Sequence, residues 1–157
     1  MSRVEESLVE SEERKLKFGL VPDGCWGFNL SHLLTRKAWE VVRKNAKIRS
    51  LGKCAICGAP ITTFEAHEVW SYNEKKGIQK LEDVIAICRD CHMAIHIDRT
   101  ALKGNLERAE EHYMKVNNVS YSQMKLDLKL AHEEHKRRNL VSEWSTDFTW
   151  LRKLIEK

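Results

Sequence analysis

The chain has 157 residues, of which 42% are apolar, and its 27 lysines and arginines exceed its 23 aspartates and glutamates to give a formal net charge of +4. This apolar content is typical of a globular protein, and the length suits one domain, or one core with appended helices. No apolar run is long enough to span a membrane, and the charged opening MSRVEESLVESEERK offers no secretory signal, so we expect an intracellular, cytoplasmic protein without a membrane partner.

The part of the chain before the first cysteine pair divides into two segments. Residues 1–18 are highly charged and poor in aromatic residues, which predicts a mobile tail or a loosely held helix. Residues 19–53 begin with an irregular stretch that contains glycines and aromatic residues. They then predict a helix from Arg36 to about Ile48, with Thr35 as its N-terminal cap.

Basic residues gather in this predicted helix, with Glu40 as the only acidic residue among them. Such a run is either a solvated helix face or a surface that meets the backbone phosphates of nucleic acid with little sequence preference. The segment alone does not separate these two interpretations. The candidate nucleic-acid-binding residues are Arg36, Lys37, Arg43, Lys44 and Lys47.

The rest of the chain predicts a small mixed region followed by helices. Residues 54–100 predict a strand from Phe64 to Trp70, a second strand from Val84 to Ile87, and a short helix after Cys88. Residues 101–157 predict a helical extension packed on this core, with one helix over about 105–116 and a longer one that begins near Ser120. Residues 144–154 are apolar enough to fold back onto the body, although their secondary structure is ambiguous. We therefore expect an α+β fold.

Four of the five cysteines form two Cys-x-x-Cys pairs, Cys54 with Cys57 and Cys88 with Cys91. Each pair places two thiolates on one tight turn, and zinc prefers four soft ligands at the corners of a tetrahedron. In a chain without an export signal, two such pairs favour a structural zinc over disulfides, whereas a redox role would need only one pair. We expect Cys25 to be a small buried apolar residue.

Three histidines predict a second metal site. His92 and His96 are four residues apart, so on a helix they share one face and can reach a common ion. His67 can complete the set if its strand packs on that helix. Three protein ligands with an open coordination position are typical of a catalytic metal site. We interpret the remaining histidines, including His112 and His132, as ordinary polar residues of helix faces.

The segments CAIC, EAHEVW and LEDVIAICRDCHMAIH together resemble the zinc-ribbon subtype of the HNH endonucleases, in the His-metal finger (ββα-metal) superfamily. The resemblance covers residues 54–96. It implies a small zinc-stabilised ββα-metal core with flanking α-helices, and metal-dependent hydrolysis of phosphodiester bonds in DNA by cutting or nicking. It also implies that His67, His92 and His96 hold a second divalent cation, which is Mg²⁺, Mn²⁺ or Zn²⁺.

The sequence departs from the family pattern at two positions beside the predicted catalytic metal. In the family, a histidine after the first metal ligand acts as the general base, and an asparagine before the last strand orients it. The matching residues here are Glu68 and Asp83. A glutamate, with a reference pKa of about 4.3, is a weaker base than a histidine at about 6.5, unless burial or Asp83 raises its pKa. Glu68 can instead act as an additional metal ligand.

Both departures concern catalysis rather than metal binding. The alternative function is therefore a catalytically degenerate zinc protein of the same fold. Such a protein would bind nucleic acid or a protein partner, for example as a component of a phage or of a defence system.

Overall fold

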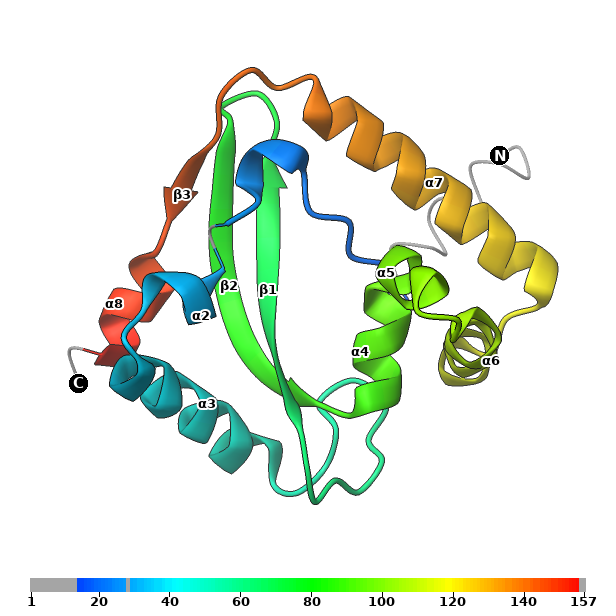
Figure 1. Cartoon of the computed structure of the whole chain (residues 1–157), viewed down its shortest axis with the longest axis horizontal. Helices are drawn as coiled ribbons and strands as arrows, with labels where there is room; N and C mark the ends of the chain where they lie inside the picture. The colour runs from blue at the N-terminus through cyan, green and yellow to red at the C-terminus, as the bar shows by residue number, and fades with distance from the viewer. Residues whose placement is uncertain (1–13, 28, 156–157) are drawn as a thin grey trace.

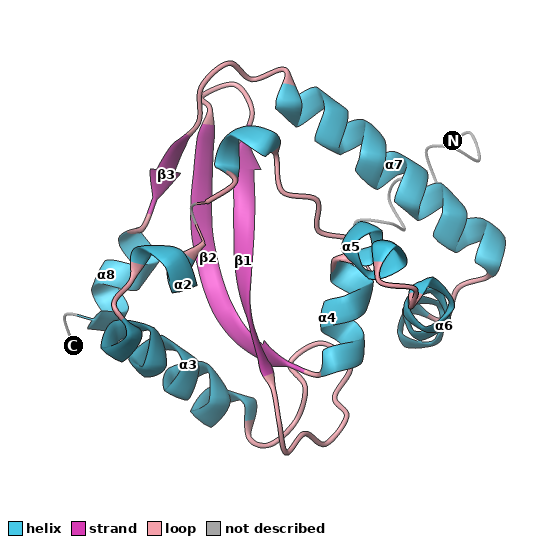
Figure 2. Ribbon diagram, viewed as in Figure 1, coloured by secondary structure: helices cyan, strands magenta, loops and turns pink. Residues whose placement is uncertain are grey.

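The computed structural model describes residues 14–27 and 29–155 and shows, within them, an α+β fold with seven α-helices and a three-stranded sheet (Figures 1 and 2). The predicted α+β class is confirmed. The elements in chain order are the 3-10 helix η1 (Asp23–Cys25), α2 (Leu30–Leu33), α3 (Arg36–Ser50), β1 (Glu65–Asn73), β2 (Ile78–Ile87), α4 (Arg89–Ile95), α5 (Ile97–Leu102), α6 (Leu106–Asn117), α7 (Tyr121–Asn139), β3 (Ser145–Asp147) and α8 (Thr149–Ile155).

A long antiparallel hairpin of β1 and β2 forms the centre of the molecule (Figure 1). Its turn needs glycine at position 77, because Gly77 has a φ of +64° and a Cβ there would lie 2.5 Å from the Glu143 carbonyl oxygen. The short strand β3 adds to β2 in parallel, opposite Ile78–Lys80. The second strand is longer than its apolar end at Val84–Ile87 predicts, because it begins at Ile78 and its first half also pairs with β1 and β3.

The hairpin has two faces because successive residues of a strand point to opposite sides. On one face, Val84 and Ala86 pack with Val42 of α3 and with Leu151 of α8. On the other face, Ile87 packs with α4 and with buried residues of α6 and α7. Helices α3 and α4 therefore lie on opposite sides of the hairpin, as Figure 2 shows.

Local capping explains where the two long helices begin. Thr35 accepts a hydrogen bond from the Ala38 amide at 3.1 Å, so the predicted N-terminal cap of α3 is confirmed. Ser120 accepts a hydrogen bond from the Gln123 amide at 3.1 Å and caps α7 in the same way. The end of the chain, ambiguous in sequence, forms β3 and α8.

The N-terminal segment differs from the mobile tail predicted for residues 1–18. Residues 1–13 lie outside the described part of the chain. Leu16 is fully buried, and the ring of Phe18 stacks on that of Tyr113 with centroids 4.1 Å apart. Leu16 and Phe18 therefore belong to the core, because these two apolar side chains reach a helix more than ninety positions later in the chain. None of the described helices is long and apolar enough to cross a membrane.

Candidate metal centre

The four paired cysteines meet where the loop after α3 passes the start of α4. Their sulfur atoms all lie within 4.8 Å of one another, with 3.8 Å between Cys54 and Cys91 and 3.7 Å between Cys57 and Cys88. A tetrahedral ion with metal–sulfur bonds of about 2.3 Å has sulfur–sulfur edges of about 3.8 Å. The predicted grouping is confirmed, and its geometry and soft donors fit a metal such as zinc.

The electrostatics of this cluster also favour a cation. A hydrogen bond with Cys91 lowers the pKa of Cys54 to about 4, whereas burial raises the pKa of Cys88 to about 11. The pKa of Cys91 is raised because its thiol bonds to Cys54 in a buried position. Four thiolates are therefore unfavourable together without a positive charge among them, and a bound divalent ion would supply it.

Three histidines form a second cluster where β1 meets α4. His67 comes from β1, His92 from α4 and His96 from the C-terminal cap of α4, and each offers a ring nitrogen within 4.8 Å of the others. Burial lowers the pKa of His67 to about 4 and that of His96 to about 3. These imidazoles are therefore neutral at pH 7, which is the form that binds a metal. The structure brings together the three residues that the sequence predicts as one site.

Glu68 lies on the opposite face of the hairpin from these histidines. Because His67 and Glu68 are successive residues of β1, their side chains point to opposite sides of the sheet. The Glu68 carboxylate accepts a hydrogen bond from the Leu30 amide at the start of α2. Burial raises its pKa, and hydrogen bonds from Leu30 and the Trp70 side chain partly offset that effect. The predicted general base is therefore held by α2 and is not beside the three imidazoles.

Asp83 is held by a different neighbour. Its carboxylate lies 3.1 Å from the Arg49 guanidinium and accepts a hydrogen bond from the Val84 amide at 2.8 Å. Its partner across the hairpin is Val69 rather than Glu68. The structure therefore does not place Asp83 in contact with Glu68, the residue that it was expected to orient.

A carboxylate that the sequence analysis missed does lie beside the histidines. Glu65 is two residues before His67 in β1, so both side chains are on the same face of the strand. A carboxylate oxygen of Glu65 lies 3.9 Å from Nδ1 of His92. The spacing of two residues was visible in the sequence, but assigning a face required the register of the hairpin.

The cations nearest to the histidines also differ from the predicted ones. Burial lowers the pKa of His92, and the charges of Arg99 and Lys103, in and just after α5, add to this effect. Both of these side chains are exposed. Among the described residues, no carboxylate lies within ion-pair distance of either one. The predicted DNA-binding residues Arg36, Lys37, Arg43, Lys44 and Lys47 all lie on α3, which packs on the other face of the hairpin.

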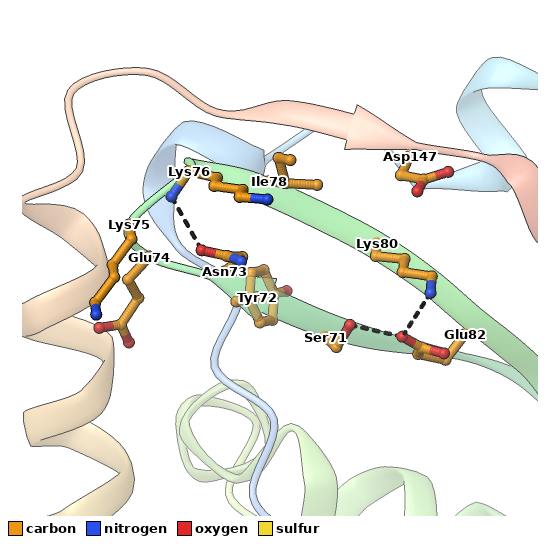
Figure 3. Close-up of a pocket in the computed structure, with 10 residues that line it drawn as sticks. All are labelled: Ser71, Tyr72, Asn73, Glu74, Lys75, Lys76, Ile78, Lys80, Glu82 and Asp147. Carbon is orange, nitrogen blue, oxygen red and sulfur yellow. Dashed lines mark hydrogen bonds and ion pairs between the residues drawn. The ribbon is translucent and has the colours of Figure 1, made fainter.

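A shallow pocket of about 680 Å³ lies between the hairpin turn and β3, away from both clusters (Figure 3). Its charged groups offset one another, since Glu82 lies 3.8 Å from the Lys80 ammonium and accepts a hydrogen bond from Ser71 at 2.8 Å. None of the clustered cysteines or histidines lines this pocket. The two clusters that could hold a metal are therefore separate from this pocket.

Comparison of the chain with protein-family models, with curated proteins and with solved structures gives no match.

Proposed function

We propose that this protein is a metal-dependent endonuclease of the HNH type that hydrolyses phosphodiester bonds in DNA. The observation that carries the proposal is the set of three neutral imidazoles on β1 and α4, where a hairpin runs directly into a helix. That order is the one expected of a ββα-metal core. The four-cysteine cluster at the start of the same helix supports it, because it would hold the helix against the hairpin.

The two clusters have different roles in this proposal. The structural zinc is held by four thiolates, which fill its coordination shell. These are the thiolates of Cys54, Cys57, Cys88 and Cys91. The three histidines would hold a second divalent cation and leave positions on that cation open for water and substrate. Such an ion, when bound, activates a water molecule and stabilises charge on the phosphoryl oxygens. The histidines then serve to hold it in place on two rigid elements.

We assign proton transfer to Glu65 in preference to Glu68. Glu65 shares the face of the histidines and lies 3.9 Å from His92, whereas Glu68 is bonded to α2 on the other face. Glu65 is half-exposed, so its carboxylate is accessible to a water molecule. In contact with His92 it can also fix the orientation of that imidazole, a common arrangement for metal-binding histidines.

We assign the phosphate contacts nearest the cleavage site to Arg99 and Lys103. They are exposed, without carboxylate partners among the described residues, and on the histidine side of the molecule. The basic face of α3 would meet phosphates farther along the DNA. Replacing Arg99 and Lys103 with Gln should therefore lower cleavage more than replacing Arg43 and Lys44, while both changes flatten the salt dependence of binding. Equal effects on cleavage would argue against this assignment.

A plasmid-nicking assay tests the proposal. Purified protein should convert supercoiled plasmid to nicked or linear DNA when Mg²⁺ or Mn²⁺ is added and not in excess chelator. His67→Ala should abolish cleavage and keep the structural zinc. His132→Ala, a change to a histidine that bonds instead to Asp98 at 2.9 Å, is the matched control and should cleave normally. Intact plasmid in the presence of every divalent ion tried would reject the enzyme.

A second candidate function is DNA or protein binding without catalysis. The observation that favours it is the placement of Glu68 and Asp83, which are bonded to Leu30 and Arg49 rather than to the metal-binding face. Under this alternative, the protein binds DNA with the same affinity in the presence and absence of metal at the histidines. It would also leave the DNA intact.

A further inference from the structure

A fifth potential ligand side chain lies against the four-cysteine cluster. Nε2 of His112, in α6, is 3.1 Å from the sulfur of Cys91. The imidazole is half-buried, and Cys91 is fully buried. The two residues are 21 positions apart, so this contact depends on the packing of α6 against α4 and not on a local turn.

The hydrogen bonds to the other sulfurs show why this contact matters. The Cys57 amide lies 3.5 Å from the sulfur of Cys54, and the Cys91 amide lies 3.4 Å from the sulfur of Cys88. Both donors belong to the backbone of the cysteine turns themselves. Among the described residues, His112 is the only side chain outside the four cysteines that makes a polar contact with one of their sulfurs.

The charge of the site gives this donor its effect. Four thiolates around one divalent ion leave a net charge of −2, and two of the sulfurs, those of Cys54 and Cys91, are in the buried core. An excess negative charge in such a place is unfavourable unless hydrogen-bond donors offset it. An N–H donated to a thiolate also withdraws electron density from the sulfur and makes it a weaker nucleophile.

We propose that His112 donates its Nε2–H to the metal-bound thiolate of Cys91 from outside the coordination shell, so that helix α6 takes part in retaining the metal and in shielding Cys91 from electrophiles. His112 is then a positioning residue that acts through Cys91. The inference depends on metal binding by the four cysteines and is independent of nuclease activity.

The distances favour an outer donor over direct ligation. The sulfur–sulfur edges of 3.7 and 3.8 Å already match a closed tetrahedron of four thiolates. A separation of 3.1 Å between Cys91 and His112 is in the range of a hydrogen bond to a thiolate and is shorter than those edges. The site therefore needs no fifth ligand.

Three variants of the full chain test this inference. His112→Leu fills the space without a donor, and His112→Gln supplies an amide N–H in its place. Met114→Ala is the control, because Met114 packs on the same core from α6 and makes no hydrogen bond to the cysteine sulfurs. Each protein is loaded with Co²⁺ or Zn²⁺, and native folding is verified by circular dichroism. The measurements are the sulfur-to-cobalt charge-transfer band, the rate of zinc transfer to a chelator and the alkylation rate of Cys91, mapped by mass spectrometry.

We expect His112→Leu to shift the charge-transfer band to lower energy and to raise zinc transfer and alkylation of Cys91 about 10- to 100-fold, the effect of losing one hydrogen bond to a charged group. His112→Gln should give a band energy, a zinc-transfer rate and an alkylation rate between those of the wild type and of His112→Leu. Met114→Ala should leave the band unchanged. A band, zinc-transfer rate and alkylation rate in His112→Leu equal to those of the wild type would overturn the inference. Spectra that show the loss of a directly bound nitrogen would overturn it as well, because His112 would then be a ligand.

If His112→Leu does not fold, the comparison moves to His112→Gln and His112→Asn. The shorter amide of Asn cannot reach Cys91, so it should release zinc faster than Gln does. Equal release rates in these two variants would also contradict the role assigned to His112.

Discussion

Substitution with glutamine should affect DNA cleavage differently at the two glutamates of β1, Glu65 and Glu68. Glu65→Gln removes the carboxylate on the histidine face, and the loss of a general base lowers rates about 10²- to 10⁴-fold. Glu68→Gln changes a side chain on the other face. Its amide oxygen can still accept the Leu30 amide, and the buried charge disappears, so we expect a stability change within about 1 kcal/mol and near-normal cleavage.

Glu68→Ala separates the structural role of this residue from a catalytic one. It removes the acceptor and leaves the Leu30 amide without a partner in a partly buried position, which costs about 1–3 kcal/mol. For a chain of 157 residues this corresponds to a fall in Tm of about 2–12 °C. Thermal unfolding and plasmid nicking, each measured on all three variants, provide the comparison. Loss of cleavage in Glu68→Gln, with Tm and metal content unchanged, would refute the reasoning from strand alternation and restore Glu68 as the base.

Three further predictions concern metal, phosphate and the core. Cys57→Ser should release the structural metal and unfold or aggregate the protein, because the free energy of metal binding contributes to the free energy of folding. Full thermal stability after zinc removal would contradict this. Replacing Arg99 and Lys103 with Gln should reduce the slope of log affinity against log salt by about 2, measured by fluorescence anisotropy with labelled DNA. Asp127→Asn should lower the free energy of unfolding by about 3–5 kcal/mol, measured in urea, because this buried carboxylate pairs with Arg14 at 3.0 Å.

The grouping of the candidate metal ligands could be predicted from the sequence because it depends on short spacings between these residues. Each Cys-x-x-Cys turn fixes two sulfurs locally, and the four-residue interval between His92 and His96 fixes two imidazoles on one turn of helix. The cap at Thr35 and the start of the long helix near Ser120 are equally local, and both predictions are confirmed. The short spacings do not show that distant segments meet. The β1–β2 hairpin brings His67 close to the two histidines of α4 and its C-terminal cap.

The residues that sequence reasoning missed depend on contacts between distant elements. Assigning Glu65 and Glu68 to opposite faces required knowing which side of β1 meets α4. His112 reaches Cys91 only because α6 packs on α4, and no local pattern indicates that contact. The burial of Leu16 was missed for a similar reason. Its neighbours in the sequence are highly charged, so the local pattern does not indicate a core residue.

The central claim is that the protein cleaves DNA and needs a divalent metal ion, held by the three histidines, to do so. It is tested most directly by the rate of plasmid nicking as a function of Mn²⁺ concentration, for the wild type and for His96→Ala. We predict a saturable rise in rate for the wild type. For His96→Ala we predict no cleavage at the same concentrations, with the four-cysteine site still carrying its zinc. Equal rates for the two proteins, or no nicking by the wild type at any Mn²⁺ concentration, would contradict the account.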